Sequence, residues 1–202
     1  MNIQSFCTAS VLLALTIFHP ISQTTATSPS AEQDIFCTPL NKPLWVERLK
    51  ELRDALYRQD KEKAKTFIDF TALNKNDEIW RFVYGYEEAN SRPFTVQDFE
   101  KHFGKLFSPW FIKCLLKVKT DILHTNGTFE TAELYDQPNK TTYRVIATHN
   151  KSNNTLELNL NSNTEYKDAD GTILDGGEYS IIYIFAITQK GQLQLKKFIV
   201  AG

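Results

Sequence analysis

The chain has few cysteines, no long apolar run and none of the common catalytic motifs. A membrane-spanning helix needs about 20 consecutive apolar residues, so we expect no membrane span. Three cysteines in 202 residues are too few for a disulfide-rich scaffold. The sequence contains no G-x-S-x-G, P-loop, G-x-G-x-x-G, H-E-x-x-H or paired C-x-x-C motif. We therefore expect no metal site and no cofactor.

The charge is balanced, which bears on the class of partner. The chain has 23 lysines and arginines against 24 aspartates and glutamates, for a net charge of -1. A protein that binds nucleic acid or an anionic membrane surface usually carries a basic excess. Nucleic acid is therefore not an expected partner, which leaves an unknown small ligand or another protein.

The N-terminus resembles an export signal. Residues 11–18 are almost entirely apolar and lie between a short polar start and a small, polar segment, residues 22–30. This run has the length of a secretory apolar region and is too short to span a bilayer. No lysine or arginine precedes Lys42, so only the α-amino group supplies the usual positive charge. A disordered leader on a cytosolic protein is the alternative.

The leader divides the chain into three predicted parts. We expect residues 1–30 to be a signal peptide, cleaved after Ala26 or Ala31, and residues 31–40 to be an N-terminal arm. Residues 41–202 then form a single domain. The expected location is secreted or periplasmic.

Two cysteines remain once Cys7 leaves with the leader. In an oxidising compartment Cys37 and Cys114 are a candidate disulfide. Alternatively, Cys114 is a small buried apolar residue, because it shares a helical face with Phe111 and Leu115. Both interpretations stay open from the sequence.

Helical periodicity dominates the first half. Apolar residues recur at steps of three and four from Trp45 to Leu56, after a start near Asn41. Asp60 is expected to cap a short helix that carries Ala64, Phe67 and Ile68, and Asn76 or Asp77 to open another.

Two helix starts have clear local signals. Thr95 and Asp98 form a capping-box pattern, with Phe94 and Phe99 placed as a hydrophobic staple. Ser108 and Pro109 then fit the N-cap and first position of a further helix. We expect that helix to turn Phe111, Leu115, Val118 and Ile122 inward and to end before Gly127.

In the second half the period changes to two. Residues 142–149 and 155–161 are expected to form a hairpin, in which Leu156, Leu158 and Leu160 share a face. Residues 179–187 and 193–200 are two further strands, and residues 129–134 are a possible edge strand. The polar stretch 162–177 is expected to be a loop.

Helices followed by an antiparallel meander indicate an α+β fold. We expect N-terminal helices packed on a curved antiparallel sheet of about four to five strands. This element order resembles the NTF2-like, or cystatin-like, superfamily, which includes ketosteroid isomerase-like enzymes, cyclases and many binding modules without catalysis. Residues 67–70, 78–80, 166–167 and 198–202 are also similar to segments of small secreted bacterial proteins of unknown function.

The resemblance to NTF2-like proteins implies a site between helices and sheet. A ketosteroid isomerase-like mechanism needs a carboxylate base and a phenol or protonated acid in an apolar cavity. The weak catalytic candidates are Asp69, Tyr143, Tyr183 and His102. The expected ligand-lining residues are Trp45, Tyr57, Tyr84, Trp110, Tyr143 and Tyr183.

Residues 168–173 partly resemble a calcium loop. Asp168 and Asp170 stand at alternate positions before Gly171, but the opening aspartate and closing glutamate of an EF-hand are missing. A turn between strands is the favoured interpretation.

Three functional hypotheses follow. The first is an exported, non-enzymatic binding or envelope-accessory domain with a cleft between helices and sheet. The second is an NTF2-like enzyme acting on a small apolar substrate, and the third is an inhibitor or immunity-type protein. A homodimer formed through the sheet is a further possible assembly.

Overall fold

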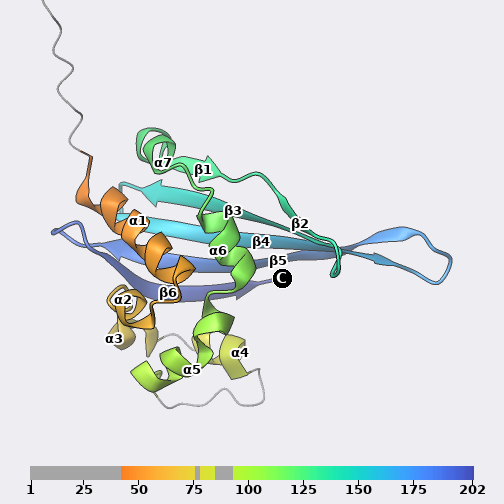
Figure 1. Cartoon of the computed structure of the whole chain (residues 1–202), viewed down its shortest axis with the longest axis horizontal. Coiled ribbons are helices and arrows are strands. Elements are labelled where there is room, and N and C mark those ends of the chain that lie inside the picture. Colours follow the sequence, from red (N-terminus) through yellow and green to blue (C-terminus); the bar gives the residue numbers. More distant parts are fainter. Residues whose placement is uncertain (1–41, 76–77, 85–92) are drawn as a thin grey trace, which may run out of the picture. The chain divides into compact units, whose positions relative to one another are not determined.

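Helices come first in the described chain and an antiparallel sheet follows (Figure 1). The computed structural model describes residues 42–75, 78–84 and 93–202. Residues Leu40–Gly202 form one compact unit. The predicted α+β class is confirmed, and the helices extend to Asn126, well past the N-terminal third of the chain.

Seven helices lie within the described residues. They are α1 (Leu44–Tyr57), α2 (Lys61–Lys65), α3 (Phe70–Leu73), α4 (Glu78–Tyr84), α5 (Val96–Leu106), α6 (Pro109–Leu115) and α7 (Thr120–Asn126). In α1 the predicted apolar face is buried, because its members recur once per turn and face the sheet: Trp45, Leu49, Leu52 and Leu56.

The strands form one antiparallel sheet. They are β1 (Thr128–Glu130), β2 (Leu134–Asp136), β3 (Thr141–Asn150), β4 (Thr155–Lys167), β5 (Ile173–Ile187) and β6 (Leu193–Ala201). The strand order is β1-β3-β4-β5-β6, and β2 also pairs with β3. The expected hairpin of β3 and β4 is present in the register that pairs Val145 with Leu160 and Ala147 with Leu158.

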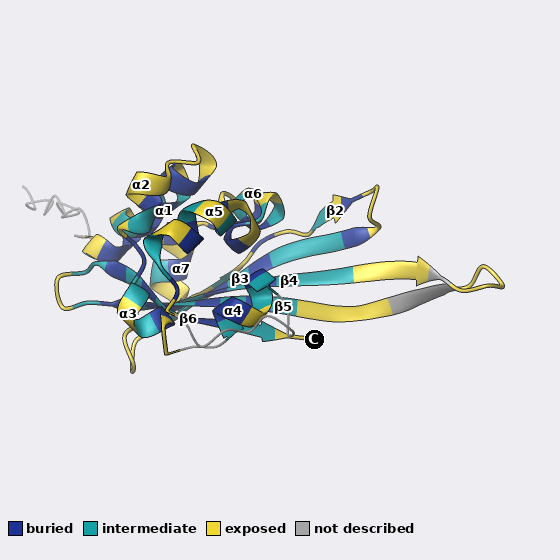
Figure 2. Cartoon of the chain, turned by 90° about the horizontal axis from the view of Figure 1, so that it is seen from below, coloured by how far each residue is buried: buried dark blue, intermediate teal, exposed yellow. Residues whose placement is uncertain are grey.

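One face of the sheet carries the helices, and the other has no described helix on it (Figure 2). Alternate residues of β4 show this division: Leu156, Leu158 and Leu160 are buried, whereas Glu157 and Asn159 between them are partly exposed. This is the pattern of a sheet with a single covered face.

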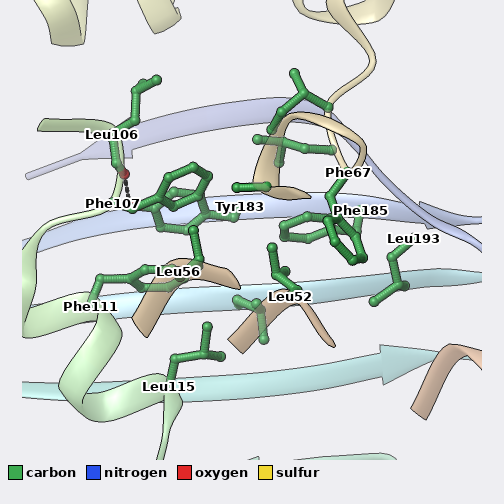
Figure 3. Close-up of a cluster of buried hydrophobic side chains, with 14 of the residues drawn as sticks. Leu52, Leu56, Phe67, Leu106, Phe107, Phe111, Leu115, Tyr183, Phe185 and Leu193 are labelled. Carbon is green, nitrogen blue, oxygen red and sulfur yellow. Dashed lines mark hydrogen bonds between the residues drawn. The ribbon is translucent and has the colours of Figure 1, made fainter. Parts of the chain in front are cut away.

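The core between helices and sheet is densely aromatic (Figure 3). The Tyr183 ring of β5 stacks on Phe111 of α6, with ring centroids 4.2 Å apart, and on Phe107 at 5.8 Å. Phe198 of β6 meets the same tyrosine edge-on. Side chains therefore fill the space around Tyr183.

The helix caps predicted at Asp60, Thr95 and Ser108 are confirmed, and the starts predicted at Asn41 and at Asn76 or Asp77 lie outside the described residues. The Thr95 hydroxyl accepts from the Asp98 amide, and the Asp98 carboxylate accepts from the Thr95 amide, which closes the capping box. Phe94 and Phe99 are both buried, and each packs against Phe70. Ser108 caps α6 and Asp60 caps α2 through their side-chain oxygens.

The prediction of one continuous helix after Ser108 is wrong, because the helix ends at Leu115 and a new helix, α7, begins at Thr120. Arg53 of α1 donates to the Val118 carbonyl at 2.7 Å, which satisfies a carbonyl at the break. The break turns α7 so that Ile122, expected to face inward, is 39% exposed. Similarly, α2 ends before Phe67, and Ile68 instead bridges to Leu195 of β6.

The prediction of a loop over residues 162–177 is also wrong. β4 continues to Lys167 and β5 begins at Ile173, and Glu165 pairs with Asp175. The two strands form a hairpin arm beyond the rest of the sheet (Figure 2). Because none of the described helices covers the arm, its strands lack the apolar alternation that marks a half-buried strand.

Cys114 is a free thiol on α6 and is completely buried. Cys37 lies outside the described residues, as does Asn41. The alternative interpretation, a small buried apolar residue, describes the environment of Cys114, and the pairing with Cys37 stays a prediction because Cys37 is not among the described residues. No helix in the described part of the chain is both long and apolar enough to cross a membrane.

Candidate functional site

The six aromatic residues expected to line one cleft lie in different environments. Trp45 and Tyr183 are buried in the core, whereas Tyr57 at the end of α1 is 67% exposed. Tyr84 stacks on Trp80 of α4. The remaining two, Trp110 and Tyr143, stack on each other with centroids 5.0 Å apart.

Trp45 packs against two histidines that are distant in sequence. Its ring lies 4.5 Å from that of His149 and 6.0 Å from that of His124. The Nδ1 atoms of both histidines are buried without a hydrogen-bond partner in the described structure. Burial lowers the pKa of His149, and the neighbouring Lys151 and His124 lower it further. The cluster holds α1 and α7 against the end of β3.

A polar network joins α4 and α5. His102 Nε2 lies 2.9 Å from the Tyr84 hydroxyl, and that hydroxyl donates to Asp98 at 3.4 Å. Lys105 donates to the Val83 carbonyl beside it. His102, a predicted acid–base candidate, thus contacts Tyr84.

Asp69, the predicted carboxylate base, has a structural role. It caps α3 by accepting from the Ala72 amide, and its other oxygen pairs with Lys196 of β6. Lys196 and these amide donors lower the pKa of Asp69. The Tyr183 hydroxyl is buried and donates to the Leu106 carbonyl at 2.6 Å. The four catalytic candidates therefore take part in separate sets of contacts.

The helical layer contains an apolar groove between the end of α1, the start of α2, α5 and α6. Its volume is about 340 Å³. The lining consists of Leu56, Tyr57, Gln59, Lys61, Phe103, Gly104, Phe107, Pro109 and Ile112. The floor is formed by buried side chains such as Phe103 and Phe107, and Tyr57 is at the rim.

Gly104 keeps one wall of this groove open. It lies inside α5, and a Cβ built there would have no atom within 4 Å. Glycine inside a helix costs roughly 1 kcal/mol relative to alanine. No packing neighbour requires glycine at this position, and the space beside Gly104 is open to the groove.

A second, polar pocket of about 290 Å³ is lined by residues such as Asn161 and Asn163, which share the β4 face of Glu157 and Asn159, opposite the buried leucines. Its side chains come from β3, β4, β5 and the loop after β1. The lining consists of Glu133, Thr142, Tyr143, Arg144, Asn161, Ser162, Asn163, Glu165 and Glu178.

The structure shows a turn where the sequence partly resembled a calcium loop. The Asp168 carboxylate accepts from the Asp170 amide, and the Asp170 carboxylate accepts from the Thr172 amide. Across the described ranges, no group of three or more histidine, cysteine or acidic side chains is arranged to hold a metal ion.

Sequence reasoning identified Tyr57 and Tyr143, one in each pocket, but missed the other lining residues. Gly104 had a detectable signal, because it interrupts an otherwise strongly amphipathic helix. Arg144 and Glu178 had none, since charged residues on a strand are ordinarily solvated.

The chain matches no protein-family model, no curated protein and no solved structure. Functional assignment therefore depends on the geometry of the two pockets.

Proposed function

We propose that this protein is an exported, non-enzymatic binding domain that takes an apolar ligand into the groove between α1, α5 and α6. The observation that carries the proposal is the open wall at Gly104 above a floor of buried phenylalanines. A concave apolar site with a few polar groups at its rim is the usual form of a ligand site.

The groove favours a ligand of limited size. Ligand pockets commonly span about 300–1,000 Å³, and about 340 Å³ lies near the lower end. One aromatic ring system or a short aliphatic chain fits this space. Tyr57, exposed at the rim, offers a flat apolar surface against which a ring can stack.

The rim also favours a negative charge on the ligand. Lys61 lies at the groove, and its ammonium donates one hydrogen bond to the Glu100 carbonyl. An ammonium has three donors, so two remain for an anionic group. The proposed ligand class is therefore an apolar organic anion.

The apolar anionic dye 8-anilinonaphthalene-1-sulfonate tests the site. We expect its fluorescence to rise on binding, and Gly104→Trp, which fills the groove, to weaken binding at least about tenfold. Gly104→Ala adds one methyl group and is the matched control, with an expected change below about twofold. Lys61→Met should weaken binding of the dye but leave binding of an uncharged analogue unchanged.

Equal binding by wild type and Gly104→Trp would overturn the groove as the site. Thermal melting of each variant checks folding, and Ile112→Gln offers a second way to alter the groove from α6. If both folded variants bind normally, the apolar ligand binds elsewhere.

Export is supported by the apolar run of residues 11–18 and the small residues after it. Intact-mass measurement of the protein from the culture medium or periplasm should show cleavage after Ala26 or Ala31. A full-length cytosolic product would contradict this part of the proposal, and the groove experiment would still stand.

A further inference from the structure

Gln59 has an uncommon backbone conformation beside the apolar groove. Its φ angle is 55°, in the left-handed region. It lies just beyond the end of α1, where its amide donates to the Leu56 carbonyl and the Asp60 amide donates to the Ala55 carbonyl. These two hydrogen bonds form a Schellman motif, in which the left-handed position is usually glycine. A side chain there carries backbone strain that glycine avoids.

Two other described residues besides glycines have a positive φ angle, Asn154 at 54° and Lys140 at 48°. Asparagine adopts this region more readily than most residues, and the Asn154 side chain also donates to the Ile187 carbonyl. Lys140 lies in the turn before β3 and lines neither pocket. Of the three, it is Gln59 whose side chain lines the apolar groove.

The side-chain amide of Gln59 has no hydrogen-bond partner within the described part of the chain, and the residue is exposed. A primary amide offers two donors and one carbonyl acceptor. In a mostly apolar ligand site, a small number of such groups fixes the orientation of the ligand. Gln59 therefore adds a second donor group to the rim of the groove, besides Lys61.

The ammonium of Lys61 is held above the floor of the groove. It donates to the Glu100 carbonyl of α5 at 2.8 Å and lies 5.9 Å from the centroid of the Phe103 ring. Asp60, between Gln59 and Lys61 in the chain, uses its carboxylate to cap α2. An anionic group that reaches Lys61 can therefore keep its apolar part on the phenylalanine floor.

We propose that Gln59 and Lys61 together bind the carboxylate of the ligand, which makes the ligand class an aromatic or short aliphatic carboxylic acid. A carboxylate is planar and has two oxygens; one accepts from the Lys61 ammonium and the other from the Gln59 amide. The hydrocarbon part lies against Phe103 and Phe107. The side chain at position 59 thus serves recognition at a cost in stability. This inference rests on the groove proposed above as the ligand site.

The fluorescent acid 2-naphthoate and its uncharged methyl ester are the probes. We expect Gln59→Gly to weaken binding of the acid about fivefold or more and to change binding of the ester by less than about twofold, because only the acid carries the anion that the amide binds. The variant should also melt about 2 °C or more above the wild type, because glycine relieves the left-handed strain. A residue with a merely structural role would not lose binding while it gains stability.

Lys140→Gly is the matched control for the strain. It also removes a side chain from a left-handed position, but one outside the groove. We expect its melting temperature to rise by a similar amount and its binding of 2-naphthoate to stay within about twofold of the wild type. The comparison separates the effect of glycine on the backbone from the effect of losing the Gln59 amide.

Gln59→Glu tests the charge of the ligand with almost no change in side-chain size. A carboxylate at this position should weaken binding of 2-naphthoate about tenfold or more at neutral pH and leave binding of the ester unchanged. Gln97→Glu adds the same charge to an exposed position at the start of α5, outside the groove. This control should change binding of either probe by less than about twofold.

The possible failures can be told apart. Equal binding of 2-naphthoate by the wild type, Gln59→Gly and Gln59→Glu would overturn the role of Gln59 and leave the groove as the site. Equal losses for the acid and the ester, or an equal loss for Gln97→Glu, would also overturn it. A wild type that binds the sulfonate dye but not 2-naphthoate would overturn the carboxylate class. Binding of neither would overturn the groove itself.

Discussion

The Tyr183 hydroxyl of β5 donates a hydrogen bond to the carbonyl of Leu106, the last residue of α5, across 2.6 Å of buried core. Leu106 is in the last turn of its helix, where carbonyls have no partner within the helix. The phenol therefore satisfies an orphaned carbonyl and ties the helical layer to the centre of the sheet.

Tyr183→Phe should destabilise the protein although it leaves the ring stacking intact. The substitution leaves the buried Leu106 carbonyl without a hydrogen-bond donor, and an unpaired buried acceptor costs about 1–3 kcal/mol of stability. Chemical denaturation should show this loss of unfolding free energy. An unchanged value would mean that water reaches the carbonyl.

His149 should make stability depend on pH. Because its pKa is lowered in the folded state, the unfolded chain takes up the proton more readily as the pH falls below the ordinary value of about 6.5. Unfolding free energy should therefore be highest above this pH and fall towards pH 5, by at most about 1.4 kcal/mol per pH unit for one proton. The buried, unpartnered Nδ1 is the physical reason.

His149→Phe provides the comparison for this effect, because phenylalanine can keep the stacking on Trp45 and cannot be protonated. Denaturation curves at several pH values should be flatter for the variant between pH 7 and pH 5. Identical pH dependence in both proteins would contradict the assignment to His149.

The Asp69–Lys196 pair should contribute modestly at neutral pH. Its two side chains are 21% and 37% exposed, so solvent screens them in part. A double-mutant cycle with Asp69→Asn and Lys196→Met should give a coupling of about 0.5–1 kcal/mol. Asparagine can still cap α3, which limits the change to the ion pair.

The coupling should disappear in acid. The pKa of Asp69 is lowered in the folded state, so its stabilisation is complete above the ordinary value of about 3.9 and is lost as the pH falls through the folded value. The same cycle repeated at successively lower pH should give a coupling that declines as Asp69 becomes protonated in the folded protein.

Cys114 should resist alkylation in the folded protein. Burial raises its pKa to about 11, so almost no thiolate is present at neutral pH. A maleimide or iodoacetamide should label Cys114 slowly before unfolding and rapidly in denaturant, as peptide mass spectrometry would show. Failure to label the denatured, unreduced protein would indicate a disulfide at this residue.

Local signals in the sequence predicted most of the elements correctly. The capping box of Thr95 and Asp98 formed because its hydrogen bonds join residues three apart. The alternation of Leu156, Leu158 and Leu160 correctly predicted a strand, β4, because every second residue of a strand with one covered face is buried. Such features need only a few neighbouring residues.

The errors arose where contacts are distant in sequence. At the break before α7, the Val118 carbonyl accepts a hydrogen bond from Arg53 of α1, which is 65 residues away in sequence. The arm was mistaken for a loop because its strands are exposed, so their pairing leaves no apolar pattern. Their pairing extends the β4–β5 hairpin beyond the buried part of the sheet, with a register shift between Asn163 and Glu165.

The sequence by itself determined that helices come before strands and which side of α1 and of the buried part of β4 faces the core, because apolar residues repeat with the period of the element that buries them. Only the tertiary structure decided which polar and aromatic side chains meet. Tyr57 reaches a groove with Gly104, and Arg144 shares a pocket with Glu178, because helices and strands far apart in the chain pack side by side.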